Sequence, residues 1–475
     1  MDHKRAVETL AGLESRGDVN RLRVADLHAW PLLRLMLWGR LLQQDAPPAT
    51  APRAGSIPLP PRTFLQRLLD RSPLPLLPSS ARAGIVFFSR QHDYGDRIGG
   101  SFYNRHLDPM TALFRETAAF AKCEIATTQA LETQPRSIPT SFIEAPRDRG
   151  TPPAIEGFAA LRDLGDLPLP TEQEFAKSAR RLVRDRDFFL TLLRQLQPRV
   201  VFLVCYYDPE AMALIAAARQ LGIRTVDVQH GKQGLYHGLY SHWTHIPECG
   251  YELLPDFFWV WGEPSRDHIA RWQPTGCRHH RPIVGGNRWL ARWQTADDFE
   301  PDPETTRFLA ELRRPEKVIL FSLQPLAEPL PAHVLDAMRR SPAGWRWLLR
   351  AHPHQRPQIP ALKDRLTAAG AANFELEQSS AIPLYALLRR SQHHITCWSS
   401  VGYEASAFGV ATTILHPSGR QLFAEEIERD VFSYADTGDA LLAAIRAGAA
   451  SASAVRYIET SDRIAQDALD QILAA

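Results

Sequence analysis

The sequence predicts an α/β protein built from two tandem βα domains, and three observations support this. Short, strongly apolar runs of strand length recur from Ile85 onward, and segments of helical length separate them. Continuous apolar strands are typical of parallel sheets that are buried on both faces. A chain of 475 residues is also too long for one ordinary core. We therefore expect two Rossmann-like domains after a helical N-terminal extension.

The expected domain boundaries follow changes in composition. Residues 1–80 read as a helical extension that ends in a proline-rich linker, with a proline- and alanine-rich stretch at Asp45–Pro61. Residues 81–300 would form the first Rossmann-like domain and residues 301–455 the second. Residues 456–475 would form an amphipathic C-terminal helix.

The clearest βαβ unit lies in the first domain. The apolar run Val200–Cys205 predicts a buried parallel strand. Asp208 is a suitable N-cap for the helix that follows, and Gly222 supplies its stop. The next strand, Ile223–Val228, delivers a Gln-His-Gly turn at its carboxyl end, which is the edge where ligands of such sheets bind. The other strands expected in this domain are Ile85–Ser89, Phe257–Trp261 and Pro282–Val284.

The second domain follows an acidic and arginine-rich bridge, Asp297–Glu316. Its expected strands are Lys317–Ser322, Trp347–Leu349, Phe374–Leu376, His394–Cys397 and Thr412–Leu415. Segments of helical length lie between them, including Leu384–Arg390.

Composition excludes some classes of function. A net charge of +2 gives no support to a nucleic-acid partner. The five cysteines show no paired spacing, which favours buried thiols in a reducing, cytoplasmic setting. No apolar run is long enough to cross a membrane. Two segments that mix apolar residues with arginine, Leu32–Trp38 and Phe64–Leu69, could contact a membrane surface. Helices of this kind more often pack on a protein core.

Chemistry-bearing residues follow two strands of the second domain. Arg350, His352 and Pro353 end one strand, and the cationic side chains of Arg350 and His352 suit a phosphate. The His352-Pro353 pair could instead be a polar loop in which the proline ends the strand. Ser399 and Ser400 end another strand at the start of a helix, where free N–H groups and the helix dipole favour an anion. Both serines could instead be simple N-caps.

Three further segments extend this predicted nucleotide site. Glu404 lies one helical turn after Ser400 and could bind a ribose, because a buried stripe of Val401, Ala405 and Phe408 would put it beside the edge of the core. It could instead lie on a solvated helix face. Glu377 could contact a base or ribose, or could be an ordinary surface carboxylate. The segment Gly419–Phe423 could close over a ligand, or could be a turn followed by a helix.

The first domain offers candidates for acid–base chemistry. His230 follows a strand and precedes Gly231, which lets a ligand approach the backbone. It could equally be a histidine satisfied by local hydrogen bonds. Asp93 and Asp96, in the loop Arg90–Arg97, are the alternative bases. Gln229, Tyr236 and His237 are the residues expected to contact an acceptor. Aromatic rings in this loop suit sugar faces, and they suit a hydrophobic core equally.

In this order and spacing, the His352-Pro353 pair and the Ser399-Ser400 turn resemble GT-B glycosyltransferases of bacterial capsule and surface-polysaccharide synthesis. That group includes Kdo transferases, sialyltransferases and CDP-glycerol glycerophosphotransferases. The resemblance covers the last third of the chain. It implies that the His-Pro pair and the serine turn hold a CMP or CDP leaving group. The acidic-acidic-Gly triplet of the sialyltransferases is missing, and so is an Asp-x-Asp metal motif.

The expected function is therefore transfer of a sugar, with a CMP-sugar favoured as donor, to a glycan or lipid-linked saccharide acceptor. No cofactor and no metal are expected. His230, Asp93 or Asp96 would deprotonate the acceptor. The protein would work in the cytoplasm, and attachment to the inner face of the membrane is kept as an alternative. The alternatives are a glycerophosphotransferase or nucleotide-sugar epimerase on the same fold, or an inert partner in glycan assembly.

Overall fold

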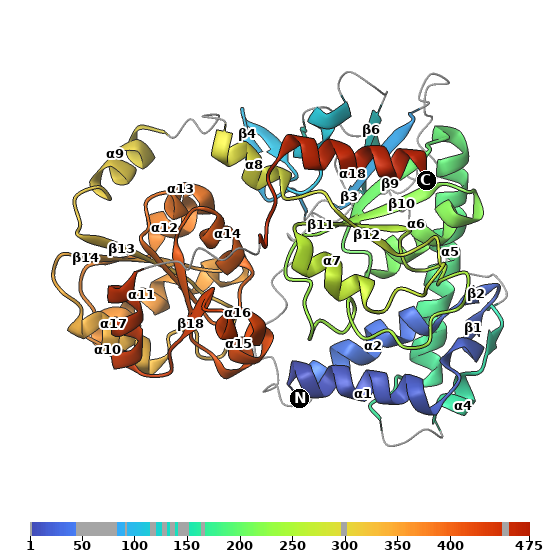
Figure 1. Cartoon of the computed structure of the whole chain (residues 1–475), viewed down its shortest axis with the longest axis horizontal. Helices are drawn as coiled ribbons and strands as arrows, with labels where there is room; N and C mark the ends of the chain where they lie inside the picture. Colours follow the sequence, from blue (N-terminus) through green and yellow to red (C-terminus); the bar gives the residue numbers. More distant parts are fainter. Residues whose placement is uncertain are drawn as a thin grey trace, which may run out of the picture. The chain divides into compact units, whose positions relative to one another are not determined.

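The computed structural model describes residues 2–43, 83–90, 93–114, 120–125, 131–133, 138–140, 152–162, 167–295, 302–448 and 456–475. The chain divides into two compact units (Figure 1). The first unit contains the described residues up to Thr295 and also Glu459–Ala475. The second unit contains the described residues between these two segments. The predicted linker and the segment Phe64–Leu69 lie outside the described residues.

The first unit is built on a parallel sheet in the order β12-β11-β10-β9-β3-β6-β7. Its strands are β3 (Ile85–Arg90), β6 (Phe120–Ile125), β7 (Ile138–Thr140), β9 (Val200–Val204), β10 (Arg224–Val228), β11 (Phe257–Val260) and β12 (Arg281–Val284). Strands β9, β10 and β11 are buried along most of their length, as the continuous apolar runs predict.

Small antiparallel pairs accompany this sheet. They are β1 (Arg23–Val24) with β2 (Leu27–His28) and β8 (Ile155–Glu156), and β4 (Asp96–Ile98) with β5 (Ser101–Tyr103).

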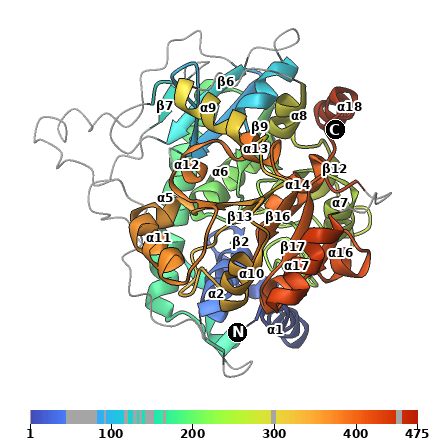
Figure 2. The same cartoon turned by 90° about the vertical axis from the view of Figure 1, so that its left-hand side faces the viewer.

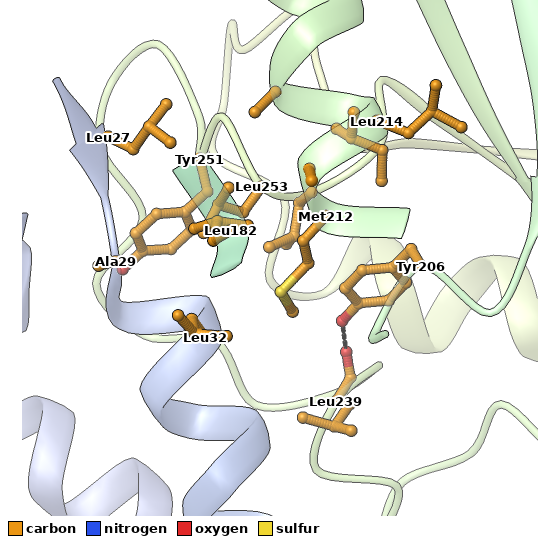
Figure 3. Packing of buried hydrophobic residues seen from close by; sticks show 14 of the residues in the cluster. Leu27, Ala29, Leu32, Leu182, Tyr206, Met212, Leu214, Leu239, Tyr251 and Leu253 are labelled. Carbon is orange, nitrogen blue, oxygen red and sulfur yellow. Dashed lines mark hydrogen bonds between the residues drawn. The ribbon is translucent and has the colours of Figure 1, made fainter. Parts of the chain in front are cut away.

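Helices cover both faces of the first sheet. They are α1 (His3–Arg16), α2 (Trp30–Gln43), α4 (Phe158–Arg162), α5 (Glu172–Leu196), α6 (Pro209–Gln220), α7 (Glu263–Ala270), α8 (Arg288–Thr295) and α18 (Asp462–Ala474), with a 3-10 helix at Asp108–Phe114. Side chains of α1, α2, α5 and α6 share one apolar cluster with the sheet. Figure 3 shows part of it, where Met212 of α6 lies between Tyr206 and residues of α2 and α5.

The opposite face is covered by α18, which comes from the far end of the chain (red in Figure 1). Ala465, Ala468, Leu469 and Ile472 are at most 1 % exposed and pack with the sheet residues Phe202 and Trp259, among others. The predicted amphipathic helix is therefore present. It completes the core of the first unit.

The N-terminal helices also belong to this core. Leu32, Leu33 and Leu37 of α2 are buried, and so is Arg34, whose ion pair with Glu14 is fully enclosed. The apolar and basic pattern of α2 thus reflects a buried arginine inside the protein. Within the described residues, no helix is both long and apolar enough to cross a bilayer.

The second unit has a parallel sheet in the order β15-β14-β13-β16-β17-β18. Its strands are β13 (Lys317–Ser322), β14 (Trp345–Arg350), β15 (Phe374–Glu375), β16 (His393–Thr396), β17 (Ala411–Ile414) and β18 (Phe432–Tyr434). The five predicted strands of this domain are confirmed; β13 has the predicted ends, and the ends of the other four differ by at most two residues.

Helices flank this sheet on both sides (Figures 1 and 2). They are α9 (Pro303–Glu311), α10 (Ala332–Arg340), α11 (Ile359–Ala368), α12 (Glu377–Ala381), α13 (Leu384–Leu388), α14 (Val401–Ala407), α15 (Pro417–Leu422), α16 (Ala424–Glu428) and α17 (Gly438–Ala447), with a 3-10 helix at Pro353–Gln358. Side chains of α10, α11 and α17 bury one face of the sheet. Helix α9 occupies part of the bridge predicted at Asp297–Glu316.

The cysteines are free in the structure. Cys123 and Cys397 are buried as expected, but Cys249 is exposed, because it lies in the loop before β11 and not in a strand.

Candidate functional site

A cluster of polar side chains occupies the carboxyl edge of the first sheet, where β3, β9 and β10 end. Arg90, at the end of β3, is central to it. Its Nη1 lies 2.9 Å from Oδ2 of Asp208, and its backbone N–H donates to Oδ2 of Asp93 at 2.8 Å. His230 lies at the end of β10, and its Nε2 is 3.1 Å from the hydroxyl of Tyr207. We call these five residues the Arg90 cluster.

The electrostatics of the cluster keep His230 neutral. Burial lowers the pKa of His230 to about 4, the carboxylate of Asp93 opposes this shift, and the guanidinium of Arg90 adds to it. The same acidic neighbours raise the pKa of Arg90 despite its burial. At neutral pH the cluster therefore contains an imidazole that can accept a proton beside a fixed positive charge.

Two more histidines lie around His230. The ring of His106 is 6.2 Å from the His230 ring, and the ring of His237 is 5.4 Å from that of Tyr207. Burial lowers the pKa of His106 well below its usual value and that of His237 to about 3. Of the residues predicted to contact an acceptor, His237 thus lies beside the cluster.

The backbone beneath the cluster is held tightly. Cys205 follows β9 with a φ of 62°, a conformation that costs a non-glycine residue about 1 kcal/mol or more. Asp227 accepts hydrogen bonds from the N–H of Tyr206 at 3.0 Å and the hydroxyl of Tyr240 at 2.8 Å. The Tyr206 hydroxyl donates to the carbonyl of Leu239 (dashed line in Figure 3). These bonds fix the turn that presents the Tyr207 and Asp208 side chains.

The structure brings Asp93 and His230 together but gives other predicted residues different partners. Asp96 accepts two hydrogen bonds from Arg105, at 2.7 and 3.0 Å. Gln229 is 2 % exposed, and its side chain joins the ends of β10 and β11 by accepting from the N–H of Trp261 at 2.6 Å. Tyr236 is only partly buried. Gln229 and Asp96 therefore support the structure around the cluster.

In the second unit, Gln324 connects the two segments that the sequence singles out. It follows β13, and its Oε1 accepts from the N–H of Trp398 at 2.6 Å. Its carbonyl oxygen accepts from Nε2 of Gln355 at 2.9 Å, and Oε1 of Gln355 accepts from the N–H of His352 at 3.2 Å. The His352-Pro353 turn and the turn that begins at Trp398 are therefore held at the same edge of the sheet. We call them the paired turns.

The side chain of Arg350 hydrogen-bonds to the protein's own backbone. Its Nη1 donates to the carbonyl oxygens of Ser379, at 2.8 Å, and Ile382. The N–H of Ala351 donates to Oγ of Ser380 at 3.0 Å. These contacts tie β14 to α12, so Arg350 positions the His352-Pro353 turn rather than extending from it.

The serine turn has partly exposed hydroxyl groups, whereas the carboxylate in the helix after it is buried. Ser399 and Ser400 are both partly exposed, and Ser400 makes no side-chain hydrogen bond as the N-cap of α14. Glu404 is 9 % exposed and accepts a hydrogen bond from the hydroxyl of Tyr385. It thus faces the protein.

The buried face of α14 differs from the predicted stripe. It consists of Gly402, Tyr403, Glu404 and Ala405. The reason is Gly402, since a Cβ there would lie 3.0 Å from the ring of Phe432, so the helix packs on β18 through that position.

Glu377 contacts a lysine of α11 and not the paired turns. It is exposed and pairs with Lys363 at 3.1 Å. Residues Gly419 to Leu422 belong to helix α15, in agreement with the predicted alternative of a turn followed by a helix. A Cβ on Gly419 would lie 1.9 Å from the carbonyl oxygen of Cys397, so glycine is needed where α15 passes β16.

Sequence reasoning missed Tyr207, Asp208 as an ion-pair partner, and Gln324. All three follow strands at the carboxyl edge, and that position was the available signal. No group of His, Cys, Asp and Glu side chains suited to a metal ion occurs among the described residues.

Two Rossmann-like units in one chain, each a parallel sheet between helices, define the GT-B class of fold. No protein-family model matches the chain, and no curated protein matches its sequence.

Solved structures of UDP-N-acetylglucosamine 2-epimerases are similar to it. A protein from Listeria monocytogenes assigned to that activity is 16 % identical with a TM-score of 0.52, over 83 % of this chain and 96 % of that one. The enzyme from Neisseria meningitidis bound to UDP-GlcNAc is 12 % identical with a TM-score of 0.51, over 82 % and 99 %. S. aureus MnaA with UDP is 13 % identical with a TM-score of 0.50, over 80 % and 94 %. The predicted fold class is confirmed.

Proposed function

We propose that this protein is an enzyme that acts on a nucleotide-activated sugar, and that it epimerises the sugar. The observation that carries the proposal is the pair of turns joined by Gln324 at the carboxyl edge of the second sheet. Ligands of open α/β sheets bind at this edge. The similar solved structures, two of which hold UDP or UDP-GlcNAc, favour a uridine nucleotide over the cytidine nucleotide expected from the sequence.

The nucleotide would bind on the paired turns. His352 and the hydroxyls of Ser399 and Ser400 would contact the phosphates. Glu404, which accepts a hydrogen bond from the Tyr385 hydroxyl, would contact a ribose hydroxyl. Arg350 would act as a positioning residue, since its Nη1 is already bonded to carbonyl oxygens.

The Arg90 cluster would supply acid–base chemistry. Epimerisation at a carbon requires that a proton is removed from one face of the sugar and returned to the other. Neutral His230 or the Asp93 carboxylate can remove a proton. Arg90 would stabilise negative charge that develops on the sugar or on a leaving group.

Glycosyl transfer is the second candidate. The His-Pro pair and the serine turn also resemble enzymes that use CMP- or CDP-activated donors. In that reaction His230 or Asp93 would deprotonate an acceptor hydroxyl, and the nucleotide would leave with the charge held on the paired turns.

A thermal-shift screen with CMP, CDP, UDP and GDP tests the nucleotide site, because a ligand bound only by the folded state raises the melting temperature. We expect UDP to give the largest shift. The shift should vanish in His352→Ala and persist in His245→Ala, an exposed histidine used as a matched control.

Reaction in heavy water then separates the two activities. Incubation with UDP-GlcNAc should place deuterium on the sugar of recovered nucleotide-sugar, and His230→Gln should abolish this exchange. Release of free nucleotide only when a saccharide acceptor is added would instead favour transfer. If no nucleotide shifts the melting temperature and no donor reacts, the proposed function is wrong.

A further inference from the structure

A pocket lies at the edge of the first sheet opposite to the Arg90 cluster, where β10, β11 and β12 begin. Its volume is about 500 Å³, within the usual range for small-molecule sites. Charged side chains line it: Arg219, Arg224, Arg278, Arg281, His279 and Asp256. Strand β10 runs from this edge toward His230, so the basic pocket lies roughly 20 Å from the Arg90 cluster at 3.3 Å of rise per residue.

The charges in the basic pocket do not balance. Asp256 is the one carboxylate side chain among the lining residues, and both of its oxygens are in use. Oδ2 accepts from the N–H of Thr225 at 2.9 Å, and Oδ1 lies 2.5 Å from Nδ1 of His279. Burial alone would raise the pKa of Asp256, but the hydrogen bonds to His279 and Thr225 hold it below its usual value. The terminal carboxylate of Ala475 also lines the pocket, so two negative charges face four guanidinium groups.

Two of the arginines are partly engaged by the protein. Arg224 donates through Nη1 to the carbonyl oxygens of Ile472, at 3.2 Å, and Leu473, at 3.0 Å. Arg219 donates through Nη2 to the carbonyl of Cys249, while its buried Nη1 has no hydrogen-bond partner among the described residues and is 3.6 Å from Asp256. Carbonyl contacts leave the positive charge of both side chains in place.

The other two arginines are available to a ligand. The side chains of Arg278 and Arg281 form no hydrogen bond or ion pair with the described part of the chain, although the backbone N–H of Arg281 donates to the carbonyl of Asp256 at 2.9 Å. Arg278 is exposed, and the guanidinium of Arg281 lies 5.6 Å from the centre of the Phe257 ring. Phe257 and Ile223 give the pocket an apolar wall between these cations.

The loop that carries these cations is held in a fixed shape. His280 lies between His279 and Arg281 with a φ of 62°. Its ring is buried, with Nδ1 2.7 Å from the carbonyl of Pro255 and Nε2 accepting from the N–H of Tyr251 at 2.9 Å. A Cβ on Gly250 would lie 2.4 Å from that ring, so glycine makes room for it. A strained residue with two specific contacts indicates a preformed site and not a loose surface loop.

We propose that the basic pocket binds a diphosphate-bearing small molecule. About two uncompensated positive charges match a diphosphate, and guanidinium groups bind phosphate oxygens in pairs. The pocket also has room and an apolar wall for an organic group. This site goes beyond the proposed function, since none of its residues belongs to the Arg90 cluster or to the paired turns.

Inorganic pyrophosphate is the probe for the charged part of this ligand. Binding is measured by calorimetry on the full chain. The melting temperature is also compared with and without pyrophosphate. Sodium chloride brings both samples to the same ionic strength, so that general charge screening is equal in the two. We expect saturable binding to the wild-type protein. Arg278→Gln/Arg281→Gln should weaken it at least tenfold.

The control matched to the single variant Arg278→Gln is Arg194→Gln, which also removes one positive charge from an exposed position, on α5. It should change the dissociation constant less than twofold. Arg278→Gln alone, at an exposed loop position, serves if the double variant fails to fold, and should still weaken binding severalfold. Equal affinity in the wild type and the pocket variants, or no saturable binding at millimolar pyrophosphate, would overturn the proposal.

Discussion

Replacing Glu14 with glutamine should destabilise the first unit strongly. Glu14 and Arg34 form an ion pair whose side chains are 1 % and 0 % exposed. Oε1 of Glu14 also accepts from Nε1 of Trp30 at 2.7 Å, and Oε2 accepts from the N–H of Thr244 at 2.7 Å. Glutamine has nearly the same shape and can keep part of this hydrogen bonding, but it cannot neutralise Arg34.

The magnitude follows from the enclosure of the pair. Removing one partner of a buried ion pair costs about 3–5 kcal/mol, because the other charge stays buried. Arg34 retains carbonyl contacts to Gly238 at 2.9 Å and Ser241 at 2.9 Å, which favours the lower end of that range. A loss of about 3 kcal/mol lowers the melting temperature of a large domain by roughly 5–10 °C.

The assay is thermal and urea unfolding of the full chain, followed by far-UV circular dichroism, with attention to the first transition because two units can unfold separately. The double variant Glu14→Leu/Arg34→Met removes both charges and should be less destabilised than the sum of the two single variants. The reasoning fails if Glu14→Gln melts within 1 °C of the wild type, or if the double variant is additive.

Three other predictions rest on single features. The pKa values of His230, His280 and His393 are lowered to about 4, and those of His237 and His394 to about 3, so below the usual 6.5 the unfolded chain binds protons that the folded chain does not. The melting temperature should therefore change little from pH 8 to 7 and fall from pH 6.5 toward 4; a rise on acidification would contradict this. Gly419→Ala should cost about 1–3 kcal/mol because its Cβ would meet the Cys397 carbonyl, whereas Gly12→Ala, with open space in helix α1, should gain up to about 1 kcal/mol; urea unfolding of both variants gives the comparison. Gln324→Ala should weaken nucleotide binding at least tenfold in a thermal-shift titration, while Gln466→Ala on the surface of α18 leaves it unchanged, and equal binding by both would remove Gln324 from the site.

The strands of both units were largely predictable because strands buried on both faces are apolar throughout. Lys317–Ser322 shows this, since its predicted and observed ends agree. Strand β18 escaped prediction because Phe432–Tyr434 is too short to stand out from its surroundings. Helix α5 also lies outside the predicted elements, although a capping box at Thr171 and Glu174 marks its start in the sequence.

The sequence predicted where the residues of the candidate site lie in the fold, but not which side chains they contact. His230 and Asp93 lie at the expected edge of the sheet. Which carboxylate a cation takes depends on side-chain directions across neighbouring strands, and no spacing in the sequence encodes that. Asp96 therefore pairs with Arg105, and Arg350 turns toward backbone carbonyls, although their residue types suit catalysis and phosphate binding equally well.

The position of α18 has a consequence for synthesis of the chain. The face of the first sheet that includes Phe202 and Trp259 stays without its cover until residues 462–474 leave the ribosome. At 5–20 residues per second, roughly 10–30 s separate the completion of α8 from the arrival of α18. During that interval the nascent first unit exposes a broad apolar surface. A chaperone that holds such surfaces should therefore associate with this chain until translation reaches its last helix.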